Sequence, residues 1–167
     1  HILHSEIINF PESVAINEKN FPDNQFSSYL RSEIDKNSDG VLSLDEVSAI
    51  KRIICSGRYI QSLKGIEFFF NLEELMCQNN AITNLDISQN EKLKLLVFSD
   101  NKLSSLDVSH QLLISYIDVS GNKLTTLDVS KNSNLRILTC NANLLKELNL
   151  NYNTNLSNLE CRGNNLS

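Results

Sequence analysis

An asparagine recurs every 21 residues through the C-terminal part of the chain, and this period limits the fold more than any other feature. It occupies Asn80, Asn101, Asn122, Asn143 and Asn164. Apolar residues keep the same step, with one column at Leu75, Leu96, Ile117, Leu138 and Leu159 and another at Ile82, Leu103, Leu124, Leu145 and Leu166. A fixed period of this length predicts a solenoid, in which each repeat packs only on its neighbours.

Each repeat contains a short alternation that is typical of a β-strand. Leu75 and Cys77 lie two residues apart and are therefore expected on the same, inward side of a strand. One repeat cannot bury both of its faces, so we expect successive strands to stack about 4.8 Å apart. The asparagine at each turn is expected to bond the loop backbone of its own and the next coil, because an unpaired buried amide is costly.

The cysteines are interpreted as core residues. Cys77, Cys140 and Cys161 share an inward column with apolar residues, where a thiol packs as a small hydrophobic group. Cys140 and Cys161 lie on adjacent coils, so a disulfide between them is conceivable, but the inward stacking of their side chains disfavours it. Cys55 precedes the repeats and is expected to be buried in a helix.

Before the repeats, the segment DKNSDGVLSLDE runs from Asp35 to Glu46 and matches the calcium loop of an EF-hand at every defined position. The expected Ca²⁺ ligands are the side chains of Asp35, Asn37, Asp39, Ser43 and Glu46 and the carbonyl of Val41. Gly40 supplies the sharp turn of such a loop. A single loop of this kind indicates a weak, structural site rather than a sensor.

Two other interpretations of this segment stay open. Ser43 and Glu46 also form an S-x-x-E capping box, which is compatible with calcium binding. Alternatively, a polar loop joins two helices and binds no ion. In each case two helices are expected, with apolar faces at Phe26, Tyr29, Leu30 and Ile34 and at Leu44, Val47, Ile50 and Ile54. Asp23 or Asn24 is the expected N-cap of the first helix.

The repeat unit LxxLxCxxNxLxxLDVSxNxx resembles the bacterial leucine-rich repeat family over residues 72–167. The phrase IQSLKGIEFFFNL is similar to the first repeat of internalin-like surface proteins, in which an EF-hand-like helical cap precedes the repeats. The resemblance implies an α+β fold, a right-handed solenoid with its parallel sheet on the concave face. It also implies an N-terminal two-helix cap and a secreted or cell-surface location.

On this basis the chain divides into four parts. An extended segment, residues 1–20, precedes the helical cap, residues 21–56; an atypical first repeat, residues 57–71, leads into the regular repeats, residues 72–167. The last repeat is partial, so we expect further repeats to follow in the natural protein. The chain begins with His1 and contains no visible signal peptide.

The solenoid exposes the outward positions of its strands, and these vary from repeat to repeat. The candidate partner-binding residues on the predicted concave face are Met76, Leu95, Val97, Tyr116, Asp118, Ile137, Thr139 and Glu160. A contiguous apolar patch with polar neighbours indicates a partner, and tyrosine is a common anchor. The alternative is cross-strand packing, which favours the same residue types without any partner.

Other functional classes find little support in the sequence. The net charge of −5 argues against nucleic-acid binding, and no apolar stretch approaches the roughly 20 residues of a membrane span. His110 has no nucleophilic partner in phase, and the acidic column Asp86, Asp107 and Asp128 is interpreted as bonding nearby backbone N–H groups. We therefore expect a non-enzymatic protein-recognition module. One alternative is a structural spacer. Another is a carbohydrate-binding module, which has less support because glycan binding prefers exposed tryptophan and the chain contains none.

Overall fold

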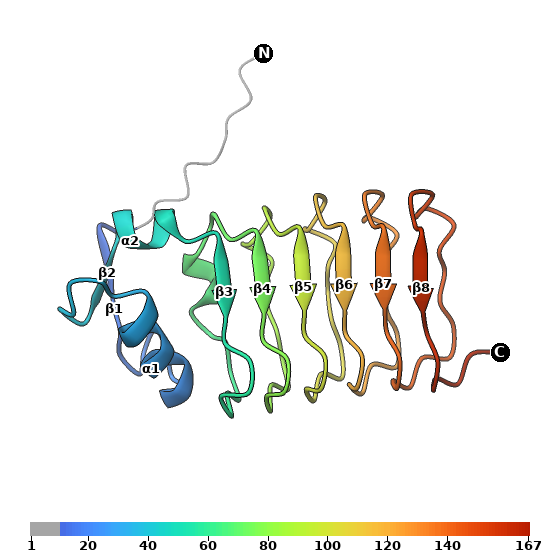
Figure 1. Ribbon diagram of the computed structural model, residues 1–167, viewed down its shortest axis with the longest axis horizontal. Coiled ribbons are helices and arrows are strands. Elements are labelled where there is room, and N and C mark those ends of the chain that lie inside the picture. Colours follow the sequence, from blue (N-terminus) through green and yellow to red (C-terminus); the bar gives the residue numbers. More distant parts are fainter. Residues whose placement is uncertain (1–10) are drawn as a thin grey trace, which may run out of the picture.

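The computed structural model describes residues 11–167, so the first ten residues of the predicted extended segment lie outside the described part. Six parallel strands follow one another in a single sheet, in the order of the sequence (Figure 1). They are β3 (Arg52–Ile54), β4 (Glu74–Met76), β5 (Leu95–Val97), β6 (Tyr116–Asp118), β7 (Ile137–Thr139) and β8 (Asn158–Glu160). The stacked coils confirm the solenoid that the period predicts, while its right-handed winding stays a prediction.

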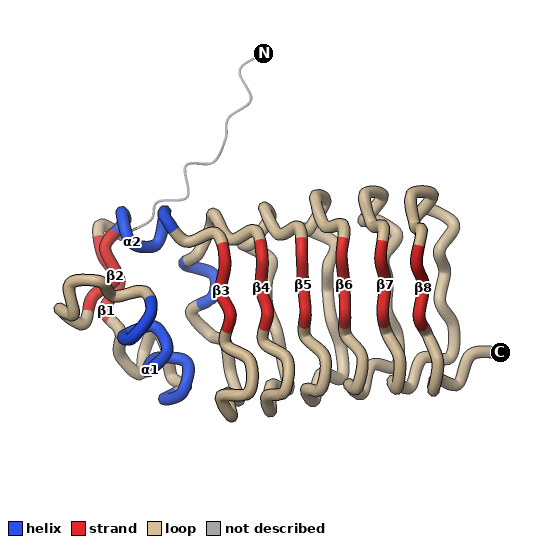
Figure 2. Tube along the Cα trace, viewed as in Figure 1, coloured by secondary structure: helices blue, strands red, loops and turns tan. Residues whose placement is uncertain are grey.

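The middle residue of each strand points into the core, as the alternation predicts. Leu75, Leu96, Ile117 and Leu138 are fully buried, whereas Leu159 on the last strand is 39% exposed. Long loops join the strands and complete each coil (Figure 2). Within the described residues, no coil or helix covers the far side of β8, and its coil is the least buried part of the stack.

The sheet starts earlier than the sequence suggested. The second helix, α2 (Leu44–Ala49), is followed by β3, which pairs in parallel with β4. The prediction that Ile54 lies on the second helix is therefore wrong, and so is the placement of Cys55 in a helix. Ile53 is fully buried between exposed neighbours, which is the alternation of a strand.

The N-terminal unit, residues 11–49, contains β1 (Ser13–Ala15), α1 (Asn24–Glu33), β2 (Val41–Ser43) and α2. β1 and β2 pair in an antiparallel ribbon. The predicted first helix is confirmed, with Asp23 as its N-cap and Phe26, Tyr29 and Leu30 buried. A short 3-10 helix, η1 (Ile66–Phe68), lies in the coil that joins β3 to β4.

The N-terminal unit is bonded to the first coil by Asp23. One carboxylate oxygen accepts hydrogen bonds from the backbone of Gln25 and Phe26 at 2.9 Å, which caps α1. The other oxygen accepts from the backbone of Gln61 and Ser62 at 2.8 and 3.1 Å, which lie in the β3–β4 loop. One side chain thus caps α1 and also bonds α1 to the first coil.

The asparagine ladder predicted from the sequence is confirmed. The Asn122 amide nitrogen donates to the carbonyls of Phe98 and Val119 at 3.0 Å, and its oxygen accepts from the Leu103 N–H at 2.9 Å. Asn101 and Asn143 make the equivalent bonds. Each asparagine bonds its own coil and the preceding one, so the prediction of bonds to the next coil is wrong.

A second amide ladder runs along the other turn of each coil, in the loop that leads into the next strand. It was not predicted from the sequence. Its members are Asn90, Gln111, Asn132 and Asn153, all buried. The Asn132 amide nitrogen donates to the carbonyls of Val108 and Gln111 at 2.9 and 3.0 Å. Asn90, Gln111 and Asn153 bond the preceding coil in the same way. Both turns of each coil therefore use side-chain amides to satisfy buried carbonyls.

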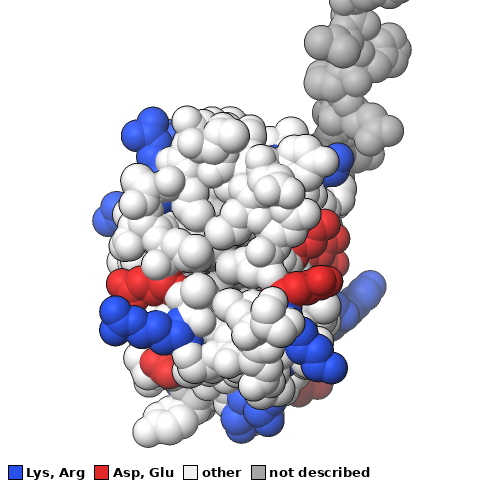
Figure 3. Space-filling model, turned by 90° about the vertical axis from the view of Figure 1, so that its right-hand side faces the viewer, with Lys and Arg blue, Asp and Glu red and all other residues white. Residues whose placement is uncertain are grey.

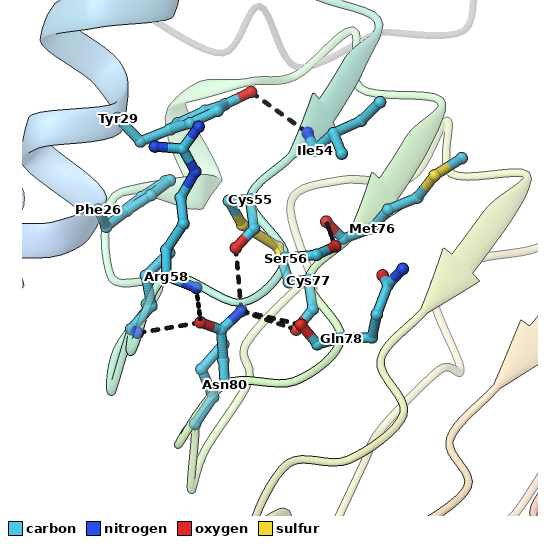
Figure 4. Close-up of a disulfide and its surroundings, with 12 residues drawn as sticks. Phe26, Tyr29, Ile54, Cys55, Ser56, Arg58, Met76, Cys77, Gln78 and Asn80 are labelled. Carbon is cyan, nitrogen blue, oxygen red and sulfur yellow. Dashed lines mark hydrogen bonds between the residues drawn. A yellow bond between two sulfur atoms is a disulfide. The ribbon is translucent and has the colours of Figure 1, made fainter.

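The first two coils are joined by a disulfide between Cys55 and Cys77, with a Cα–Cα distance of 4.9 Å (Figure 4). The interpretation of Cys77 as a free core thiol is therefore wrong. The amide of Asn80 donates to the carbonyls of both cysteines at 3.0 Å, so the ladder begins at this bridge. Cys140 and Cys161 remain free thiols.

Candidate functional site

The open sheet face consists of the outward residues of the strands, two from each. The strand register aligns Arg52, Glu74, Leu95, Tyr116, Ile137 and Asn158 in one row and Ile54, Met76, Val97, Asp118, Thr139 and Glu160 in the other. All eight predicted partner-binding residues lie in these rows. From β4 to β7 the outward residues are partly exposed, and on β8 they are exposed.

Apolar residues of the open sheet face are concentrated toward β3–β6. Met76 and Val97 are paired across β4 and β5, and Leu95 and Tyr116 across β5 and β6. Ile54 extends this group at the β3 edge and is 47% exposed. The sequence interpretation missed Ile54 because it assigned the residue to a helix. The structure identifies it, because Ile53 is buried between two exposed residues, as expected for a strand with one face in the core.

Polar contacts border the apolar group at both ends. At the β3 edge, Arg52 Nε lies 2.5 Å from the Glu74 carboxylate. At the β8 end, the Asn141 amide donates to the Glu160 carboxylate at 2.9 Å. Asp118, the last residue of β6, accepts a hydrogen bond from the backbone N–H of Ser120 at 3.0 Å, which orients its carboxylate. The polar residues of the face are thus partly engaged with one another.

An ion-pair ladder lies just before the strands. Glu73 contacts Lys51 at 3.3 Å and Lys94 at 2.6 Å, and these residues belong to three successive coils. Hydrogen bonds from the Lys94 and Lys51 ammonium groups hold the pKa of the Glu73 carboxyl below its ordinary value. The pairs are exposed to solvent, so they add little to stability and mainly give this edge of the sheet a fixed charge pattern.

The predicted calcium loop forms a compact turn between α1 and β2. Asp35 is buried, and its Oδ2 accepts from the Gly40 N–H at 2.9 Å, while its Oδ1 is buried without a hydrogen-bond partner. The Asn37 amide donates to Asp39 Oδ2 at 2.8 Å. Asp39 Oδ1 accepts from the Val41 N–H at 2.8 Å. Gly40 has a φ of 80°, as the sharp turn requires.

Glu46 closes the loop from the first turn of α2. Its carboxylate accepts from the backbone and hydroxyl of Ser43, which confirms the capping box, and from the Lys36 N–H at 2.9 Å. Burial raises the pKa of Glu46, but the bonds from Ser43, Lys36 and Asn37 outweigh it and lower the pKa overall. Within residues 11–167, no three His, Cys, Asp or Glu side chains are grouped closely enough to hold a metal ion.

The acidic column Asp86, Asp107 and Asp128 has the structural role that the sequence indicated. Each carboxylate accepts from the backbone N–H two residues further on, at 3.0, 2.8 and 2.9 Å. Asn149 makes the same bond in the next coil at 3.0 Å. Bonds from the following serine lower the pKa of all three carboxyl groups.

The described helices include none that is long and apolar enough to cross a bilayer.

Comparisons with known proteins agree with this architecture. No protein-family model matches the chain. Internalin J of Listeria monocytogenes serotype 4b (strain F2365) is 35% identical over 70 residues, which make up 42% of this chain and 8% of that protein. The chain thus spans a small part of the curated relative that it matches.

Two solved structures have the same fold over nearly the whole chain. The functional domain of InlJ from Listeria monocytogenes, which includes a cysteine ladder, superposes with a TM-score of 0.86 at 33% identity over 93% of this chain and 34% of that one. An internalin (inlF) from Listeria monocytogenes strain 4b F2365 gives a TM-score of 0.80 at 26% identity, over 92% and 46%. Together with the repeat geometry, these similarities show that the chain shares the leucine-rich repeat fold of the internalins that it matches.

Proposed function

We propose that this domain is a non-enzymatic protein-recognition module of a secreted or surface bacterial protein, and that its partner binds the open sheet face. The observation that carries the proposal is the group of partly exposed apolar side chains aligned by the strand register, Met76, Leu95, Val97 and Tyr116. Recognition surfaces commonly have an apolar centre with an aromatic anchor and a polar rim. Here Tyr116 has the central position, and the Arg52–Glu74 pair and Glu160 form the rim.

The face is also suited to change without loss of the fold. The inward residues and both amide ladders make the buried contacts between coils, whereas the outward residues of β4 to β7 are partly exposed. Substitution of an outward residue therefore alters the surface chemistry and leaves the core intact. This separation favours recognition over a spacer, which requires no exposed apolar group.

Paired substitutions on the open sheet face and outside it test this proposal. The variant Tyr116→Ala/Ile137→Ala removes apolar area from the open sheet face, and Leu112→Ala/Leu113→Ala removes exposed apolar area, 56% and 49% exposed, from a loop outside it. Both variants and the unchanged domain are immobilised and exposed to a detergent extract of cell-surface proteins. Recognition predicts a captured protein that the first variant loses and the second keeps. Equal capture by all three would contradict the use of this face.

We further propose that the Asp35–Glu46 loop binds Ca²⁺ and that the ion stabilises the N-terminal unit. The buried, unpartnered Oδ1 of Asp35 supports this, because a buried oxygen without a donor is costly and a cation would satisfy it. The lowered pKa keeps Glu46 ionised at neutral pH, as a ligand must be. Asn37 and Asp39 supply further oxygens of the kind that Ca²⁺ prefers.

The β1–β2 ribbon leaves one more oxygen available to the ion. Ile16 N–H donates to the Gly40 carbonyl at 2.9 Å, and bonded pairs alternate with non-bonded ones in an antiparallel ribbon. The adjacent pair, Ala15 and Val41, is therefore a non-bonded one, and the Val41 carbonyl is not used by the ribbon. When bound, Ca²⁺ would supply the positive charge that draws these oxygens together.

A melting experiment separates calcium binding from plain capping. Millimolar Ca²⁺ is expected to raise the melting temperature of the unchanged domain, and a chelator is expected to reverse the rise. Asp39→Ala removes an oxygen ligand outside the capping box and is expected to abolish the Ca²⁺-dependent rise. Glu46→Ala lowers the melting temperature without Ca²⁺, since it removes the cap, and also abolishes the rise. A rise of the same size with Asp39→Ala would exclude this loop as the site.

The disulfide supports the proposed location. Disulfides persist in oxidising compartments and are rare in reducing ones, so the Cys55–Cys77 bond favours a secreted or surface protein. The experiment is thiol alkylation of the protein recovered from its own cells under denaturing conditions. Cys55 and Cys77 are expected to be protected, and alkylation of both would contradict this location.

A further inference from the structure

One inward column contains cysteines at both ends of the repeat array. Reading along the stack, the column is occupied by Cys55, Cys77, Phe98, Val119, Cys140 and Cys161. The first two are joined by a disulfide, whereas the last two lie on the adjacent coils of β7 and β8 as free thiols. The last pair has no part in the proposed recognition face or in the calcium loop.

The backbone holds the two pairs in the same relation. Cys55 N–H donates to the carbonyl of the residue before Cys77 at 2.9 Å, and Cys140 N–H donates to the carbonyl of the residue before Cys161 at 2.7 Å. Two residues further on, Gly57 donates across to the next coil at 3.0 Å, and Ala142 does so at 2.7 Å. The backbone bonding of the two cysteine pairs is thus equivalent.

This equivalence removes the objection raised from the sequence. The inward direction of the Cys140 and Cys161 side chains seemed to disfavour a bond between adjacent coils. Cys55 and Cys77 also point inward, and they are bonded at a Cα–Cα distance of 4.9 Å. That distance lies within the range of about 4.4–6.8 Å in which disulfides form.

We propose that Cys140 and Cys161 are a second disulfide-forming pair, which a thiol oxidant closes in the folded protein to fasten the β8 coil to the β7 coil. Among the coils that the structure describes, the β8 coil is the least buried. All three β8 residues are exposed, and Leu156 and Cys161 are only partly buried. Figure 3 shows this end of the solenoid, where uncharged residues fill the centre and charged residues lie toward the margin.

The burial difference within the pair determines the order of the chemistry. Cys161 is partly exposed, while burial raises the pKa of the Cys140 thiol to about 11. The Cys161 thiolate therefore attacks a sulfur of oxidised glutathione first and releases one glutathione thiolate. Cys140 then loses its proton, attacks the mixed disulfide at Cys161 and releases the second glutathione. Two protein thiols are oxidised and one molecule of oxidised glutathione is reduced to two of glutathione.

Peptide mapping tests the proposal directly. The folded chain is incubated with oxidised glutathione, quenched with acid, denatured, alkylated and digested with trypsin. Cleavage after Lys and Arg places Cys140 in the peptide 137–146 and Cys161 in the peptide 147–162. The expected result is a linked pair of these two peptides from a monomeric chain. The peptides 53–58 and 65–92, which contain Cys55 and Cys77, form the internal positive control.

The variants Cys161→Ser and Cys140→Ser complete the test. Each is expected to retain the link between 53–58 and 65–92, to lose the second link and to gain no thermal stability on oxidation. The unchanged chain is expected to melt at a higher temperature after oxidation than before. Alkylation of both Cys140 and Cys161 in the oxidised, folded chain would overturn the proposal, and so would a link that forms only between two chains.

Discussion

The repeat array and the N-terminal unit both bury polar backbone groups, but they satisfy them by different means. In the array, the same side-chain amide recurs in every coil, and a bond such as Asn122 to the Phe98 carbonyl is repeated along the stack. In the N-terminal unit, each polar group has its own arrangement, and Asp23 alone serves four backbone N–H groups. The array distributes its stability over equivalent contacts, and the unit depends on a few.

The largest effect is expected inside the array, for Asn122→Ala. The change leaves the buried Leu103 N–H without a partner, at about 1–3 kcal/mol. It also removes one of the two amide bonds to each of the Phe98 and Val119 carbonyls, which keep their bonds from Asn101 and Asn143. We expect a total loss of roughly 3 kcal/mol in the free energy of unfolding. Urea denaturation measures it.

The terminal rung provides the matched control. Asn164 makes the same kind of bonds, but it is partly exposed, so water can replace the lost amide. Asn164→Ala is expected to cost about 1 kcal/mol. Equal losses for Asn122→Ala and Asn164→Ala would show that burial does not determine how much a ladder asparagine contributes to the free energy of unfolding.

The next largest effect is expected at the junction, for Asp23→Ala. The variant loses the N-cap of α1 and both bonds to the β3–β4 loop, and we expect a loss of roughly 2 kcal/mol. Amide exchange of α1 should increase more than that of the repeats. Asp107→Ala, which removes exposed turn bonds within one coil of the array, is the control and should have a much smaller effect. Uniform exchange across the chain would contradict a local role for Asp23.

These two regions also explain what the sequence could predict. The periodic residues predicted the strands, their inward columns and the asparagine ladder, because each rung requires the same residue at the same step. The period fails at the first coil, where Tyr59 stands 21 residues before Asn80 and Cys55 stands 22 residues before Cys77. No coil precedes the first one, so no asparagine is needed there to bond a preceding turn. Because the first coil lacks the ladder asparagine, the repeat pattern predicted neither β3 nor the disulfide.

The contacts of the N-terminal unit were harder to predict for a related reason. Asp23 as a helix cap follows from local sequence, and the structure confirms it. Its second role joins residues 38 positions apart, and no repeated pattern marks such a contact. The loop between Asp35 and Glu46 could be identified from its sequence motif. Calcium binding by this loop stays a prediction. On the open sheet face, the periodic frame located the variable positions, but Ile54 lies in the coil where the period fails.

A smaller effect is expected from acid. The pKa values of Asp86, Asp107 and Asp128 are lower in the folded chain because each carboxylate accepts bonds from the following serine. Their contribution to stability is therefore complete above the unfolded-state pKa of about 4 and is lost as the pH falls through the folded-state values. Asp107→Asn should weaken this pH dependence, since Asn149 makes the same bond without a charge. Unfolding measured from pH 6 down to about pH 3 gives the comparison.

The smallest effect is expected at a turn of the array where the residue type conflicts with the backbone. The position before each ladder asparagine has a positive φ, and Ala142 adopts 52° where Gly121 and Gly163 adopt 65° and 66°. Glycine has no steric penalty in this region, so Ala142→Gly should stabilise the domain by about 0.5–1 kcal/mol.

The reverse change supplies the control for that prediction. A Cβ added at Gly163 would come no closer than 3.4 Å to its neighbours, so Gly163→Ala introduces the backbone penalty without a clash. Its effect should be equal in size and opposite in sign to that of Ala142→Gly. Because the two turns are successive rungs of one array, matched effects would show that equivalent positions carry equivalent energies. Stabilisation by both substitutions, or by neither, would instead show that each turn is set by its own neighbours, as in the N-terminal unit.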